Sequence, residues 1–163
     1  MKTLFLIPAR GGSKGLPGKN LKKINGIALI NHSVNFARKF ADDNDICVST
    51  DCNKIIKCVE NNKLKVHFKR PSRLATDNAK TIDVIKHAVS YYKSIGVIYD
   101  TLILLQPTTP FRRLEDLVNM IDLWKDEFDM LVSVKETHNS PYFNLFEENE
   151  DGYLIKSKKS DIT

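Results

Sequence analysis

The chain has 163 residues, about the length of one globular domain. Hydrophobic residues make up 42% of it and charged residues 28%, which excludes a disordered chain, a collagen-like repeat and a coiled coil as descriptions of the whole. The formal net charge of +5 favours an anionic partner but leaves nucleic acid, nucleotide and phosphosugar open.

The first part of the chain alternates short apolar runs with amphipathic segments. Residues 4–7 form an apolar run bounded by proline and glycine, which predicts a buried strand. A glycine- and lysine-rich loop follows over residues 10–19, and Asn25-Gly26 predicts a turn. Helical spacing of apolar residues runs from 30 to 41, and residues 45–50 predict a second strand.

The middle of the chain continues this alternation. Asp51 is a candidate cap for a helix around residues 55–59, and residues 66–68 predict a third short strand. A polar loop covers residues 72–80. Apolar residues then repeat at steps of three and four over residues 82–92, which predicts an amphipathic helix.

The last third carries the strongest strand signal, at residues 101–105, which ends at Gln106. Residues 114–124 predict another amphipathic helix, and residues 130–134 predict another buried strand. Near the end, Asp151-Gly152 separates two short apolar stretches and predicts a hairpin whose first arm begins at residue 142.

Strands that alternate with helices predict an α/β fold with a mainly parallel, Rossmann-like sheet and a small β excursion near the C-terminus. In such sheets ligands bind at the carboxyl ends of the strands. We therefore expect the loops at residues 10–19, 72–80 and 106–110, with the turn at Asp51, to meet at one site.

The loop at residues 10–19 has the composition of a phosphate-binding segment. Glycines let backbone amides approach a phosphate and form an anion nest, and Arg10, Lys14 and Lys19 add three cations that together suit a triphosphate. Ser13 and Asn20 break the Walker A pattern, and Ser13 also breaks the dinucleotide pattern G-x-G-x-x-G. These departures disfavour P-loop hydrolysis and NAD binding. A basic surface loop is the alternative.

The chain resembles the acylneuraminate cytidylyltransferases, the CMP-sialic acid synthetases and their relatives. Residues 9–21 match the family string A-R-x-x-S-K-x-L-P-x-K-N-L at every fixed position. Further matches follow in order, with V-S-T-D ending at Asp51, R-P and L-A-T-D within residues 70–77, and L-Q-P-T-T-P ending at Pro110 before Arg112. Compared with the related KDO cytidylyltransferases, Lys14 and Asn20 favour the sialic-acid branch.

The resemblance implies a three-layer nucleotidyltransferase fold and a reaction in which CTP and a nonulosonic acid give a CMP-sugar and pyrophosphate. It also implies Mg²⁺ as cofactor, a homodimer, and no nucleic-acid partner. We expect one nucleotidyltransferase domain over residues 1–163, with a nucleotide-binding core at 1–135. The start of a sugar-binding and dimerisation excursion is then expected at 136–163. Catalysis in such an enzyme rests on positioning and charge neutralisation.

The resemblance also implies roles for individual residues. Arg10 and Lys19 are the implied catalytic residues, as phosphate contacts. The implied nucleotide-binding set joins them with residues from three segments: Gly11, Gly12, Ser13, Lys14, Asn20, Arg70, Ala79 and Thr81. Gln106 and Thr108 are the implied sugar contacts. The alternatives are a solvated lysine for Lys14, a turn residue for Asn20 and a helix N-cap for Thr81.

Two departures from the family leave parts of the activity open. The D-x-D-like carboxylate pair that family members place near the C-terminus to hold Mg²⁺ is not found in the last part of this chain up to Thr163, so the metal ligands are unknown and we expect a truncated chain. Residues 140–143 lack the lysine of some sialic-acid enzymes, which leaves N-acetylneuraminic, legionaminic and pseudaminic acids as acceptors.

Two other functions compete with this hypothesis. One is a KDO-type or other sugar nucleotidyltransferase. The other is a non-catalytic nucleotide- or RNA-binding module, although the loop at residues 10–19 has no aromatic residue on which a base could stack. Three cysteines without metal-ligand spacing indicate a reduced compartment, so we expect a cytoplasmic protein. No apolar run reaches the length of a membrane span, so we expect no membrane partner.

Overall fold

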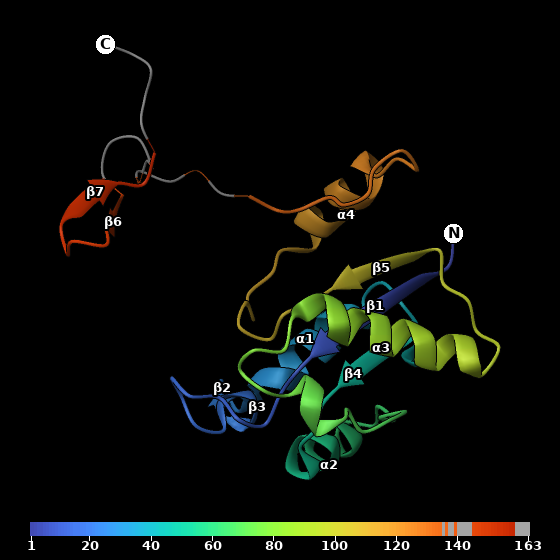
Figure 1. The fold of residues 1–163 in the computed structure, drawn as a ribbon. Coiled ribbons are helices and arrows are strands. Elements are labelled where there is room, and N and C mark those ends of the chain that lie inside the picture. Colours follow the sequence, from blue (N-terminus) through green and yellow to red (C-terminus); the bar gives the residue numbers. More distant parts are fainter. Residues whose placement is uncertain (135, 137–138, 140–144, 159–163) are drawn as a thin grey trace. The chain divides into compact units, whose positions relative to one another are not determined.

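The computed structural model describes residues 1–134, 136, 139 and 145–158 (Figure 1). The chain divides into two compact units, Met1–Arg113 and Leu114–Thr163. The predicted division into a nucleotide core at 1–135 and a sugar-binding excursion at 136–163 concerns function and stays a prediction.

The first unit contains the parallel sheet and most of the helices. Its strands and α-helices are, in chain order, β1 (Thr3–Pro8), β2 (Lys23–Ile24), β3 (Ile27–Ala28), α1 (Leu29–Ala37), β4 (Ile46–Ser49), α2 (Asn53–Asn61), α3 (Thr81–Ser94) and β5 (Thr101–Leu104). Single-turn 3-10 helices are η1 (Lys19–Leu21), η2 (Asp43–Asp45) and η3 (Ser72–Leu74).

The predicted parallel α/β sheet is confirmed. Its strand order is β4-β1-β5, and Leu6 of β1 is in register with Cys47 of β4 and Leu104 of β5. Strand β1 is therefore central, and its apolar residues 4–7 are buried. A continuous apolar run is what a strand covered on both faces requires.

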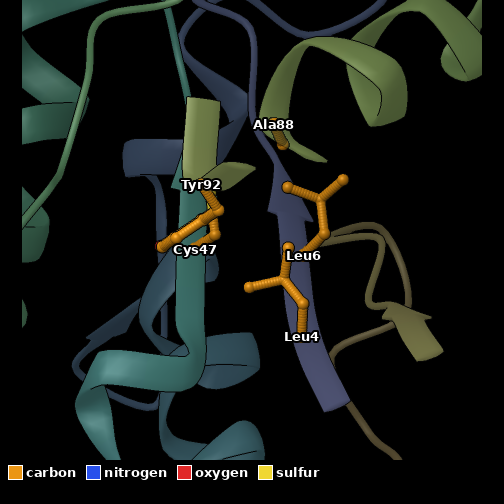
Figure 2. Close-up of a cluster of buried hydrophobic side chains, with 5 residues drawn as sticks. All are labelled: Leu4, Leu6, Cys47, Ala88 and Tyr92. Carbon is orange, nitrogen blue, oxygen red and sulfur yellow. The ribbon is translucent and has the colours of Figure 1, made fainter. Parts of the chain in front are cut away.

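The two faces of β1 pack against different helices because side chains alternate along a strand. Leu4 and Leu6 point toward α3 and form a buried cluster with Cys47, Ala88 and Tyr92 (Figure 2). Phe5 points to the other face, where its ring stacks on Phe40 beyond the end of α1 at a centroid distance of 6.3 Å. Helices α3 and α1 thus cover opposite faces, which gives three layers (Figure 1).

The turn predicted at Asn25-Gly26 is confirmed. Both residues have positive φ angles, 50° and 79°, and they join the antiparallel strands β2 and β3. This is the backbone of a type I′ turn, for which Asn-Gly is the preferred pair.

Three local predictions in this unit are wrong. Residues 66–68 form no strand, and only Lys69 makes an isolated bridge, to Thr50. Helix α2 has Cys52 rather than Asp51 at its N-cap, and α3 has Lys80 there, so Thr81 is the first helical residue of α3. The residue types Asp and Thr suggested both caps. Asp51 instead accepts a hydrogen bond from the Gly11 amide in the loop after β1.

The second unit contains α4 (Leu114–Leu123) and an antiparallel pair, β6 (Phe146–Glu148) and β7 (Leu154–Lys156). The predicted helix and hairpin are confirmed, although most of the hairpin's first arm, predicted from residue 142, lies outside the described residues. The strand predicted at 130–134 is wrong. Met130, Val132 and Val134 are 76%, 58% and 88% exposed, and no strand pairs with this segment within the described part of the chain.

Apolar composition alone does not make a strand, because each strand also needs a hydrogen-bonded neighbour.

None of the helices in the described ranges is long and apolar enough to cross a membrane.

The burial of Cys47 in the cluster of Figure 2 predicts that its thiol reacts slowly. Burial raises the pKa of the Cys47 thiol to about 12, whereas Cys52 and Cys58 are only partly buried. Because the thiolate is the reactive form, iodoacetamide at about pH 8 should label Cys52 and Cys58 of the native protein much faster than Cys47. Peptide mass spectrometry measures the three rates. Equal labelling of Cys47 in the native state, without added urea, would contradict the packing of this core.

Candidate functional site

A cavity of about 340 Å³ lies at the carboxyl ends of β1 and β5. Its lining comes from the loop after β1, the segment before and at the start of α3, and the loop after β5. The lining residues are Pro8, Arg10, Ser13, Lys14, Gly15, Lys19, Asn20, Asp77, Thr81, Gln106, Pro107 and Thr108. The cavity is therefore where ligands of parallel α/β sheets bind.

The structure brings most of the sequence-predicted site residues to this cavity. Those that line it are Arg10, Ser13, Lys14, Lys19, Asn20, Thr81, Gln106 and Thr108. Gly11, Gly12, Arg70 and Ala79 do not belong to the lining. The ligand contacts expected of all twelve residues stay predictions.

The loop after β1 is held by two side chains. The Gly11 amide donates to Asp51 Oδ1 at 2.9 Å, and Asn20 Nδ2 donates to the Arg10 carbonyl at 3.1 Å. Asn20 is buried, so its amide replaces water as the partner of that carbonyl. Asp51 and Asn20 thus fix the direction in which the loop leaves the sheet. Sequence reasoning placed the turn at Asp51 near the site but gave this residue no role beyond that of a helix cap, although it ends the matched string V-S-T-D.

Two backbone amides of this loop that an anion nest would use already have partners. Gly11 donates to Asp51, and the Ser13 amide donates to the Gly11 carbonyl at 3.2 Å. A phosphate bound by both amides would have to replace these two hydrogen bonds. The cationic side chains of the loop are better placed as anion contacts, because they line the cavity directly.

The charges of the lining are three cations and one carboxylate, so the site attracts anions. Asp77 is that carboxylate, and it pairs with Lys14 Nζ at 2.6 Å and with Arg10 Nη2 at 2.7 Å. Hydrogen bonds from Lys14 and then Arg10 lower the pKa of Asp77 below its ordinary value. Sequence reasoning missed Asp77 as a site residue, although it ends the matched string L-A-T-D.

Arg70 is a buried brace beside the cavity. Its side chain is 5% exposed and donates to the carbonyls of Ser49 and Leu74, the latter at 3.2 Å. Burial lowers the pKa of this guanidinium. The two hydrogen bonds tie η3 to the end of β4 and so fix the start of the loop that carries Asp77.

A second arginine fastens the loop after β5. Arg112 donates to the Gln106 carbonyl and, at 3.2 Å, to Ser33 Oγ on α1. Its guanidinium also lies 5.7 Å from the centroid of the Phe36 ring. The loop that carries Gln106 and Thr108 is thereby held against α1, and sequence analysis had noted Arg112 only as part of a matched string.

The described residues do not supply a metal centre. Among them, no three His, Cys, Asp or Glu side chains are grouped closely enough to hold an ion. Asp77 is engaged by two cations, and Asp51 accepts a hydrogen bond from the backbone. The described residues therefore do not fit a resident Mg²⁺.

Comparison with known proteins gives a consistent picture. A family model described as Cytidylyltransferase matches residues 4–159. A post-translational flagellin modification protein B from Campylobacter coli is 35% identical over 165 residues, which cover 98% of this chain and 68% of that protein. A CMP-N,N'-diacetyllegionaminic acid synthase from Legionella pneumophila is 34% identical over 141 residues, which cover 86% of this chain and 61% of that protein.

Among solved structures, a CMP:2-keto-3-deoxy-manno-octonic acid synthetase complexed with CTP matches with a TM-score of 0.61 and 29% identity. The match covers 75% of this chain and 46% of that one. This chain thus spans between 46% and 68% of the length of these three proteins.

The packing of the loop predicts different outcomes for two adjacent glycines. A Cβ at Gly11 would lie 2.8 Å from Cys52 Cβ, whereas a Cβ at Gly12 would meet no atom within 4 Å. Because Cys52 Cβ is fixed to the backbone, we expect Gly11→Ala to lower the free energy of unfolding by about 1–3 kcal/mol. Gly12→Ala should change it by less than about 0.5 kcal/mol. Urea denaturation followed by circular dichroism measures both, and equal losses for the two variants would contradict the close approach.

Proposed function

The chain belongs to the cytidylyltransferase family, and on that premise we propose that it is the nucleotide-binding part of an enzyme that transfers CMP from CTP to a nonulosonic acid. The other product is pyrophosphate. Support comes from the relatives, one of which is named as a CMP-N,N'-diacetyllegionaminic acid synthase, and from a similar structure described as complexed with CTP.

One observation carries the proposal: Arg10, Lys14 and Lys19 line the same cavity as Gln106 and Thr108. A triphosphate beside the three cations would place its α-phosphorus near the loop after β5. In this proposal Arg10 and Lys19 neutralise the charge that develops on the leaving pyrophosphate. Gln106 and Thr108 orient the acceptor for attack by its anomeric hydroxyl. Positioning and fixed charges can supply much of the rate enhancement in such transfers.

The acceptor in this proposal is a sialic-acid-like nonulosonic acid. A KDO-type acceptor is the second candidate, favoured by the structural similarity to the octonic acid synthetase. The position of Lys14 in the cavity lining favours the first candidate, because this lysine departs from the KDO pattern. A homodimer, a cytoplasmic location and a requirement for Mg²⁺ with ligands outside the described residues complete the proposal.

Calorimetric titration of this chain with CTP, UTP, ATP and GTP, each with Mg²⁺, tests the nucleotide preference. We expect CTP to bind at least about tenfold more tightly than the other three. Lys19→Met should weaken CTP binding by about tenfold or more, because a charge-assisted hydrogen bond to phosphate contributes about 1.5–3 kcal/mol. Lys57→Met is the matched control, since Lys57 is exposed on α2 and does not line the cavity.

Three results would contradict the proposal. They are equal affinities for the four nucleotides, an equal loss of CTP affinity in both lysine variants, and salt-dependent RNA binding tighter than CTP binding. Circular dichroism of each variant verifies that the fold is intact before the titration.

A further inference from the structure

Asp77 holds two of the three cations of the cavity at once. Its Oδ1 pairs with Arg10 Nη2 at 2.7 Å and its Oδ2 pairs with Lys14 Nζ at 2.6 Å. Each carboxylate oxygen therefore takes one cation, and all three side chains line the cavity. This is the arrangement by which two cations would hold two oxygens of a phosphate.

A phosphate and the Asp77 carboxylate need the same donors. The Lys14 side chain is 81% exposed, and its ion pair with Asp77 fixes its ammonium group at the cavity. Arg10 is 32% exposed, and both of its terminal nitrogens already contact oxygens, Nη2 that of Asp77 and Nη1 that of Thr76. A phosphate placed between the two cations, where the Asp77 carboxylate lies, therefore displaces one or both oxygens of Asp77.

The side chain of Arg10 also holds the loop that carries Asp77. Arg10 Nη1 donates to the Thr76 carbonyl at 3.0 Å, next to the ion pair with Asp77. Arg10 thus contacts two consecutive residues, Thr76 and Asp77. They belong to the segment that leads to Thr81, the cavity residue at the start of α3. Loss of the ion pairs would leave that segment held at Thr76 and, further upstream, at η3 through Arg70.

We propose that Asp77 is an internal counter-anion, which occupies the phosphate position between Arg10 and Lys14 and competes with the bound nucleotide for both cations. The proposal rests on the proposed function only in taking a phosphate as the ligand. Asp77 then sets the affinity for the nucleotide and releases the segment at residues 77–80, downstream of the Thr76 contact, when a phosphate binds. The exchange of one anion for another keeps the two cations paired in both states, so neither state carries an uncompensated charge cluster.

Asp77→Asn tests this directly, because it keeps the shape of the side chain and removes its charge. The probe is inorganic tripolyphosphate, which has no base or sugar, and its dissociation constant is measured by calorimetry at low ionic strength. Two exposed ion pairs lost from the ligand-free state predict binding that is about three- to thirtyfold tighter than in the unchanged protein. Asp42→Asn is the charge-matched control, since Asp42 is exposed at the opposite end of the sheet and should leave the affinity nearly unchanged.

A double-mutant cycle distinguishes competition between Asp77 and the phosphate from the general electrostatic effect of removing one negative charge. In a Lys14→Met background, the gain from Asp77→Asn should shrink, because one of the two competing pairs is already absent. Weaker or unchanged tripolyphosphate binding in Asp77→Asn would overturn the proposal, as would equal gains in Asp42→Asn and Asp77→Asn. Absence of binding in all variants would overturn it too.

These outcomes differ from a failure of the proposed function. That failure shows as a lack of preference for CTP among nucleotides, whereas tripolyphosphate reports only on the cations and on Asp77. A chain that prefers another nucleotide could still contain the counter-anion. A chain that prefers CTP could lack it, and the two titrations distinguish these cases.

Discussion

The close approach of Gly11 to the end of β4 is the constraint on which the site depends. The backbone there passes so near Cys52 that a single added carbon would lie 2.8 Å from its Cβ, and the Gly11 amide bonds to Asp51 at 2.9 Å. These two contacts join the ends of neighbouring parallel strands. The loop that follows must then turn across the carboxyl edge of the sheet, where Asn20 holds its other end to the Arg10 carbonyl.

The remaining loops are positioned by arginines that donate to backbone carbonyls. Arg70 links the end of β4 to η3, and Arg112 links the loop after β5 to Ser33 of α1. A guanidinium suits this task because its several donors lie in one rigid plane. Arg10 lines the cavity and has two uses, because it donates to the Thr76 carbonyl and pairs with the Asp77 carboxylate. The chain thus uses arginine both to fix loops and to bind an anion.

Such an arrangement fits a reaction that asks little covalent chemistry of the protein. Fixed loops bring the cations, Gln106 and Thr108 to the lining of one cavity. A site that is already charged and ordered loses little free energy in reorganisation during the reaction. If Asp77 balances the cations before the nucleotide arrives, the ligand-free site avoids the mutual repulsion of Arg10 and Lys14.

Much of this fold could be predicted from the sequence because its signals are local. The apolar run of β1, the helical spacing of α3 and the Asn-Gly turn each follow from a few adjacent residues. The strand expected at 130–134 was wrong because pairing depends on a neighbouring strand that composition does not reveal.

For the site too, local features could be predicted from the sequence and long-range contacts could not. Residues of the loop after β1 could be identified from their type and spacing. The partnerships of Asp51 with Gly11 and of Asp77 with Arg10 could not, because they join residues 40 and 67 positions apart. Both aspartates lie in matched strings. The sequence was equally compatible with a purely local role for each of them, as a helix cap or a loop residue.

Hydrogen exchange of the backbone amides, followed by mass spectrometry with and without CTP, tests the central claim most directly. The claim is that the loops after β1 and β5 form one nucleotide site at the carboxyl edge of the sheet. It predicts slower exchange on CTP binding in peptides that cover residues 9–21 and 105–109, with no change at residues 38–45 at the opposite edge. Saturating CTP that slows exchange only at residues 38–45, or at neither edge, would contradict it.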